Sequence, residues 1–370
     1  MSSFSGIVRF AGTVGMTSLM AVIMAQPVSA ADAIEDGQWY HAMMKTVSAA
    51  KITKGGGVTV AVVDSGVDAG HPDLAGSILP GADFTEDGPG DGQKDSDGHG
   101  TAMAGLIAAH GRVRGVAPEA KILPVRTVTR SIGTGALARG IQWAVEQEAD
   151  VISISQGSDY DDLAVREAVE AALAADIVVV AAAGNRTETK EVGYPASIAG
   201  VVAVSGVDRK GNHSSMSASG AAIDLAAPCD DVSSTYVGGT WTGLTGTSAA
   251  TALVAGAAAL ARAHFPDMSA AEVVHRLTST AVDRGVRGPD GEYGYGIVDA
   301  SAVLGRSVPS LTPSADMSVP GTPQVDHPRD ATPRRLEVGA VVAFGYLAGG
   351  LVLVLLGAWL VRSRHRNRAS

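Results

Sequence analysis

Short apolar segments alternate with helix-patterned segments through the middle of the chain. The apolar segments run for four to six residues without alternating in polarity, which is typical of strands buried on both faces. They cover 58–63, 122–125, 151–155, 177–182 and 201–205. Helices are expected at 101–109, 137–147 and 163–174. This alternation predicts an α/β fold, a parallel sheet flanked by helices on both faces, in which ligands bind beyond the carboxyl ends of the strands.

A further segment, 246–263, consists almost entirely of small apolar residues. It has no charge before Arg262 and no polar face, so it predicts a helix that is buried all round. Ser248 lies in its first turn, where free backbone N–H groups and the helix dipole stabilise negative charge. Two interpretations stay open for this segment alone. Thr247 or Ser248 caps the helix, or Ser248 is a nucleophile.

Both ends of the chain have the pattern of a secreted protein that is anchored in a membrane. Residues 1–30 predict a signal peptide cleaved after Ala30, with an uncleaved anchor as the alternative. Residues 336–361 contain a long uncharged run and predict one C-terminal transmembrane helix, with a buried soluble helix as the alternative. The arginine-rich tail, 362–370, is then expected in the cytoplasm and the rest of the chain outside it, in a single-pass arrangement at the cell membrane.

Between these ends, the pattern separates an arm, a large domain and a linker. Residues 31–57 are too few to form a domain, so we expect them to pack as an N-terminal extension on the domain that follows. That domain covers 58–304. The proline-rich stretch 305–335 predicts an extended linker without a core of its own.

Composition and charge exclude several classes of protein. Hydrophobic residues make up 46% of the chain and charged residues 18%, which favours a packed core over disorder. The formal net charge is −10, so we expect no binding to nucleic acid. The single cysteine, Cys229, excludes an intramolecular disulfide, a multi-cysteine metal site and a redox pair.

Polar residues stand at the ends of the predicted elements. Asp64 ends the first strand, and a buried carboxylate there needs a partner such as an imidazole. His99 stands between two glycines just before a helix, and Asn185 follows a strand. Asn185 is either a turn residue or a donor to an oxyanion. Each residue alone has a plain structural explanation. Together with Ser248 they follow the Asp, His, Ser order of one class of acyl-transfer enzymes.

The motifs around these residues resemble those of subtilisin-like serine proteases. The matching stretches are Asp64-Ser65-Gly66, His99-Gly100-Thr101, Ala183-Gly184-Asn185, Gly246-Thr247-Ser248 and the closing stretch 293–300. The resemblance implies that Asp64 orients the general base His99 and that Ser248 is the nucleophile. It implies an oxyanion hole made by Asn185 and the backbone N–H of Ser248.

The same resemblance implies that Ser155, Gln156 and Gly157 pair with the extended backbone of a protein or peptide substrate. Gln156 departs from the family pattern, since subtilisins usually have an apolar residue there that lines a substrate subsite. Asp73 matches a calcium ligand of subtilisins, but the segment 110–115 is shorter than their calcium loop. We therefore expect no metal and no cofactor.

The whole arrangement resembles the mycosins, the membrane-anchored proteases associated with type VII secretion systems. The resemblance implies an extracytoplasmic serine endopeptidase that processes substrates or components of such a system, with the membrane complex as a partner. Two alternatives stay open: a structural subunit of that complex whose proteolysis is secondary, and a general cell-surface protease. An esterase of the α/β-hydrolase type is disfavoured, because it expects Ser before Asp before His and a G-x-S-x-G elbow.

Overall fold

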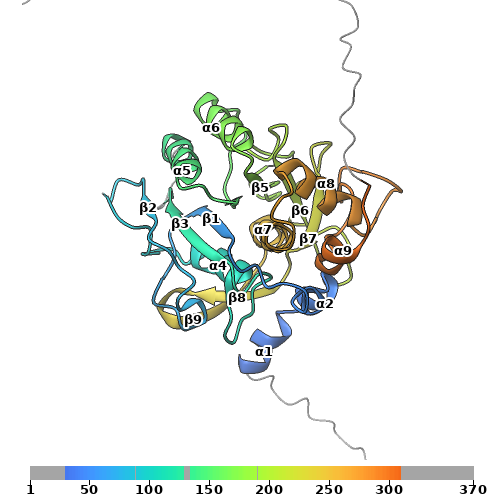
Figure 1. Ribbon diagram of the computed structural model, residues 1–370, viewed down its shortest axis with the longest axis horizontal. Coiled ribbons are helices and arrows are strands. Elements are labelled where there is room, and N and C mark those ends of the chain that lie inside the picture. The colour runs from blue at the N-terminus through green and yellow to red at the C-terminus, as the bar shows by residue number, and fades with distance from the viewer. Residues whose placement is uncertain (1–29, 88, 129–133, 190, 310–370) are drawn as a thin grey trace, which may run out of the picture. The chain divides into compact units, whose positions relative to one another are not determined.

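A parallel seven-stranded sheet forms the centre of the protein (Figure 1). The computed structural model describes residues 30–87, 89–128, 134–189 and 191–309. Strands lie in the order β2-β3-β1-β4-β5-β6-β7, and every neighbouring pair is parallel. Their bounds are β1 Thr59–Asp64, β2 Ala82–Asp83, β3 Lys121–Arg126, β4 Val151–Ile154, β5 Val178–Ala182, β6 Val202–Val207 and β7 Leu225–Pro228. The five predicted strands are present with ends shifted by one or two residues, whereas β2 and β7 were not predicted.

Helices cover both faces of this sheet, as the sequence predicts. Successive residues of β1 point to opposite sides, so Val60 and Val62 enter one apolar cluster while Ala61 and Val63 enter another. The first cluster contains residues of α4 (His99–Ala108), α7 (Thr247–His264), α8 (Ala270–Thr280) and α9 (Ala300–Gly305). The second contains residues of α5 (Thr134–Glu146) and α6 (Leu163–Ala174).

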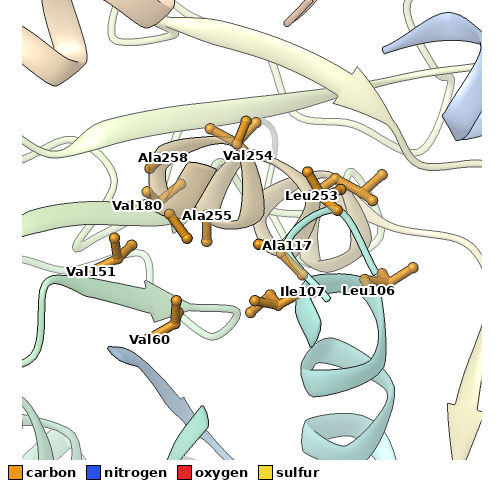
Figure 2. Close-up of a cluster of buried hydrophobic side chains, with 14 of the residues drawn as sticks. Val60, Leu106, Ile107, Ala117, Val151, Val180, Leu253, Val254, Ala255 and Ala258 are labelled. Atoms are coloured by element: carbon orange, nitrogen blue, oxygen red, sulfur yellow. The ribbon is translucent and has the colours of Figure 1, made fainter. Parts of the chain in front are cut away.

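Helix α7 is buried along most of its length. Its residues from Ala249 to Ala261 are all buried, and Figure 2 shows Val254, Ala255 and Ala258 facing the sheet beside Val180. The residue that caps α7 is Gly246, at φ 150°, without a side-chain hydrogen bond. The interpretation of Thr247 or Ser248 as the cap is therefore wrong, because both already lie inside the first helical turn.

An antiparallel hairpin packs against α4. It consists of β8 (Val232–Tyr236) and β9 (Thr240–Leu244), with the 3₁₀ turn Val237–Gly239 between them. The hydroxyl of Ser234 donates to the carbonyl of Ala102 at 2.6 Å, and that of Thr235 to the carbonyl of Thr101 at 2.7 Å. These bonds hold the first turns of α4, where His99 lies, against the hairpin.

The N-terminal arm folds into three short helices, α1 (Ala30–Asp36), α2 (Tyr40–Met43) and α3 (Thr46–Ala49). Tyr40 and Met44 are fully buried against the domain. The hydroxyl of Tyr40 donates to the carbonyl of Arg114 at 2.7 Å, and the N–H of Ala300 donates to the carbonyl of Met44 at 2.8 Å. The arm thus joins the first residues of α9 to the loop that follows α4.

Several predicted segments fall outside the described residues. They are residues 1–29 of the predicted signal peptide, residues 310–335 of the linker, the predicted transmembrane helix 336–361 and the tail 362–370. Within the part of the chain that is described, no helix is both long and apolar enough to cross a membrane.

Candidate active site

The fold brings the predicted site residues to one edge of the sheet. Asp64 is the last residue of β1, His99 the first residue of α4, and Ser248 the second residue of α7. Asn185 follows β5 by three residues. All four line one cleft of about 670 Å³, together with residues 155–157 after β4. The cleft therefore lies beyond the carboxyl ends of the strands, as parallel sheets require.

His99 and Asp64 form a tight pair. The imidazole Nδ1 lies 2.8 Å from Oδ1 and 3.0 Å from Oδ2 of Asp64, whose side chain is almost fully buried. The proton on Nδ1 is directed at the carboxylate, which leaves Nε2 free to accept a proton. The negative charge of Asp64, with smaller contributions from Asp97 and Asp95, holds the pKa of His99 well above its ordinary value, although burial opposes the shift.

Asp95 holds the turn that presents His99. Its carboxylate accepts hydrogen bonds from the hydroxyl of Ser65 at 2.9 Å and from the hydroxyl of Thr101 at 2.6 Å. It also accepts the backbone N–H groups of Gly98 and Thr101. Sequence reasoning missed Asp95. An acidic residue just ahead of a helix start was the signal that could have identified it, because such residues bind free N–H groups.

Glycine is required beside His99 for a steric reason. A Cβ on Gly100 would lie 2.1 Å from the carbonyl oxygen of Gly66, which is backbone and has no room to move. This close approach allows α4 to start directly against the end of β1, so that His99 reaches Asp64.

Ser248 lies in the same cleft, with its hydroxyl on a backbone carbonyl. Its Oγ donates to the carbonyl of Ser155 at 3.3 Å, and the Ser155 hydroxyl donates to the carbonyl of Ser248 at 3.3 Å. The start of α7 and the segment after β4 are therefore connected by hydrogen bonds at Ser248. Ser248 and His99 both line the cleft.

The amide of Asn185 has a defined orientation. Its Oδ1 accepts hydrogen bonds from the backbone N–H of Thr247 at 3.1 Å and from the Thr247 hydroxyl at 3.3 Å. Because Oδ1 faces Thr247, the Nδ2 group is left as a donor for a ligand in the cleft. Thr247, which sequence reasoning treated only as a possible cap, is thus the residue that orients this donor.

Residues 155–157 form a partly unpaired edge beside Ser248. Among the described residues, none accepts a hydrogen bond from the backbone N–H of Gln156 or Gly157. The Gln156 side chain turns inward, and its Nε2 donates to the hydroxyl of Thr127 at 2.6 Å and to the carbonyl of Val63 at 3.3 Å. It ties neighbouring strands together, and only the backbone of this edge is left for a ligand.

The residues around Asp73 do not fit a calcium site. Its Oδ2 accepts the indole N–H of Trp241 at 2.8 Å and the backbone N–H of Val113 at 2.8 Å. Two N–H donors thus bind one oxygen of this carboxylate, whereas calcium requires several oxygen ligands around it. Within the described ranges, no group of three or more His, Cys, Asp or Glu side chains is arranged to hold a metal ion.

The chain is similar in sequence to known proteins. The profile of the subtilase family, Peptidase S8, matches residues 55–296. The chain is 40% identical over 259 residues to subtilisin DY from Bacillus licheniformis, a match that covers 67% of this chain and 91% of that protein. It is also 40% identical over 259 residues to subtilisin E from Bacillus subtilis, covering 67% of this chain and 66% of that protein.

Two solved structures have a similar fold. The crystal structure of MycP1 with the N-terminal propeptide removed superposes with a TM-score of 0.67 at 30% identity, covering 73% of this chain and 98% of that chain. The structure of the MycP3 protease from the type VII (ESX-3) secretion system superposes with a TM-score of 0.64 at 33% identity. That match covers 73% of this chain and 88% of MycP3.

Proposed function

This chain belongs to the subtilase family, and we propose that it is a membrane-anchored serine endopeptidase whose catalytic domain lies outside the cytoplasm. We propose further that it processes substrates or components of a type VII secretion system. The observation that carries the peptidase assignment is the His99–Asp64 pair, 2.8 Å apart, in the same cleft as Ser248 and Asn185.

The proposed reaction begins with attack of the Ser248 hydroxyl on a peptide carbonyl. Rotation of the Ser248 side chain away from the Ser155 carbonyl directs its hydroxyl to Nε2 of His99, which takes the proton. Asp64 stabilises the imidazolium that forms. Nδ2 of Asn185 and the backbone N–H of Ser248 donate to the oxyanion, which lies at the positive end of α7.

Collapse of this intermediate releases the amine half of the substrate, which receives the proton from His99, and leaves an acyl group on Ser248. A water molecule then attacks the ester carbonyl while His99 takes its proton; the bond between the acyl group and Ser248 Oγ breaks, Oγ regains the proton from His99, and the acid half of the substrate leaves. The free backbone edge at 155–157 holds the substrate during both steps, by pairing with it as an added strand.

The location and the partner follow from the ends of the chain and from a relative. The uncharged run 338–361 within the segment 336–361, followed by the arginine-rich tail, supports a single-pass anchor with the domain outside. The likeness to the MycP3 protease, whose source is a type VII (ESX-3) secretion system, supports action on such a system. A tether favours limited processing at one place over general degradation.

The test compares wild type with Ser248→Ala. Peptide hydrolysis is expected to fall by about a millionfold, because the nucleophile is lost while the cleft stays intact. Mass spectrometry of co-secreted proteins should show fragments that are released by wild type and missing in the variant. Identical fragments in both would contradict the proposal. Secretion that survives Ser248→Ala but stops on deletion of the whole chain would assign a structural role instead.

A further inference from the structure

Three exposed carboxylates line the active-site region. Asp97 lies in the loop before α4, Asp159 in the segment after β4 and Glu188 in the loop after β5. All three residues are exposed, and none of them forms an ion pair within the described ranges. A smaller side pocket, lined by 155–159 and by residues of 182–189, adjoins the cleft. No described residue that lines the cleft or this side pocket is Lys or Arg.

Two of these carboxylates belong to a side pocket that opens next to the nucleophile. This pocket, of about 70 Å³, is walled by 155–159 on one side and by residues of 182–189 on the other, with Gly193 and Thr247 completing it. Asn185 and Ser248 line both this pocket and the cleft. A substrate whose carbonyl lies against the oxyanion donors therefore directs the side chain of that same residue into the pocket, toward Asp159 and Glu188.

The third carboxylate lies outside the side pocket. Asp97 lines the cleft beside His99 but not the side pocket. Successive side chains of an extended peptide point to opposite sides. If one side chain enters the pocket beside Glu188, the side chain of the preceding residue points away from it, to the wall formed by Asp97 and His99.

Two nearby arginines, Arg186 and Arg126, do not line the cleft, and both bind other groups. Arg186 follows Asn185 directly, but its Nε donates to the carbonyl of Ser217 at 2.9 Å and its Nη2 reaches the hydroxyl of Ser219 at 3.5 Å. Arg126 is bound by Asp83 and Asp87, each at 2.7 Å. Apart from His99, the charged side chains among the described residues that line the cleft and the side pocket are thus carboxylates, which attract a cationic group and repel an anionic one.

We propose that this cleft selects basic peptides, with Asp159 and Glu188 binding a Lys or Arg side chain of the residue that supplies the scissile carbonyl. Asp97 adds a preference for a second basic residue immediately before it. An ammonium or guanidinium group loses water on entry and regains charged hydrogen bonds, whereas an acidic side chain meets like charge. This inference rests on the proposed peptidase function.

The first measurement uses the purified full chain and quenched fluorescent peptides that differ at one position. The residue that supplies the scissile carbonyl is Lys, Arg, Leu, Phe or Glu, and the preceding residue is Ala or Lys. We expect kcat/KM for Lys and Arg to exceed that for Leu by at least about tenfold, with Glu the poorest substrate. The preference should shrink as the salt concentration rises, because the carboxylates are exposed.

Variants then assign the preference to the carboxylates. Glu188→Gln, and more strongly the double change with Asp159→Asn, should lower the Lys-to-Leu ratio of kcat/KM by about tenfold. Asp97→Asn should remove the gain from a preceding Lys. The matched control is Glu191→Gln, which removes an exposed acid of the same loop that does not line the cleft. It should leave every ratio unchanged.

Two outcomes overturn the inference: a wild-type ratio of Lys to Leu near one, or a ratio that Glu188→Gln with Asp159→Asn changes no more than Glu191→Gln does. Failure of the proposed function looks different. If no peptide is cleaved, fluorescence anisotropy of Lys and Leu peptides on Ser248→Ala still measures selection. Tighter binding of the Lys peptide there supports the inference, and equal binding overturns it.

Discussion

Three carboxylates set the protonation of His99. Asp64 has the largest effect because it contacts Nδ1, and Asp97 and Asp95 act from a greater distance, so the pKa of His99 lies above its ordinary value. The protonated pair stabilises the fold at low pH, and that contribution disappears as the pH rises through the raised pKa. The general base must be neutral to act. The enzyme is therefore expected to be most active at a pH where this pair contributes least to stability.

Replacing Asp97 tests this arrangement. Asp97→Asn removes one negative charge near the imidazolium, so it should lower the pKa of His99 and move the acid limb of the profile of kcat/KM against pH to lower pH. The measurement uses an uncharged peptide, so that substrate selection does not enter. Glu191→Gln is the control. An unmoved limb in Asp97→Asn, or an equal movement in the control, would contradict the prediction.

The site residues differ in how far the sequence could identify them. Asp64, His99, Asn185 and Ser248 stand at element ends within recognisable motifs, and the fold gathers them at one edge because parallel strands end there. Asp95 acts on backbone N–H groups, and such contacts leave no pattern that is specific to a site. The inward turn of Gln156 depends on Thr127, which is close only in the folded chain.

At the scale of elements, five strands of the parallel sheet were predictable, whereas β2, β7 and the hairpin of β8 and β9 were not. The comparisons and the observed sheet confirm the α/β subtilisin-like fold and the resemblance to mycosins. The hairpin of β8 and β9 escaped prediction because its polar side chains hydrogen-bond to α4 instead of alternating with apolar ones. Helix α8 was not predicted either, although the capping box of Ser269 and Glu272 at its start is a sequence pattern that indicates the beginning of a helix.

Trp241 on β9 supplies a hydrogen-bond donor to a buried carboxylate. Its indole N–H donates to the buried carboxylate of Asp73 at 2.8 Å, and its ring packs edge-on against His71. Trp241→Phe keeps the ring but leaves a buried oxygen with one donor fewer. We expect the free energy of unfolding to fall by about 1–3 kcal/mol, measured by urea denaturation.

The control for this change is Trp143→Phe in α5, whose indole N–H donates to no described group. It should cost less than Trp241→Phe. Addition of EDTA should leave the melting temperature unchanged, because N–H groups and not a metal ion satisfy Asp73. A clear fall in melting temperature on EDTA treatment would show that the domain depends on a bound cation.

For the molecule as a whole, the arm determines stability and not access to the cleft. Lys45 on the arm forms an ion pair with the buried carboxylate of Asp299, and Trp39 donates to the carbonyl of Asp230 at 3.1 Å. No described residue of the arm lines the active-site cleft or its side pocket. The described arm is therefore part of the folded body and lies outside the lining of the cleft.

Tyr40→Ala tests this division of roles. Tyr40 is fully buried and bonded to the Arg114 carbonyl, so its truncation should lower the free energy of unfolding by about 3–5 kcal/mol. The exposed arm residue Val47 supplies the control, since Val47→Ala should change little. At a temperature where both variants are folded, kcat/KM should equal that of wild type. An increase in kcat/KM in Tyr40→Ala would mean that a loosened arm uncovers the cleft, and the arm would then be inhibitory.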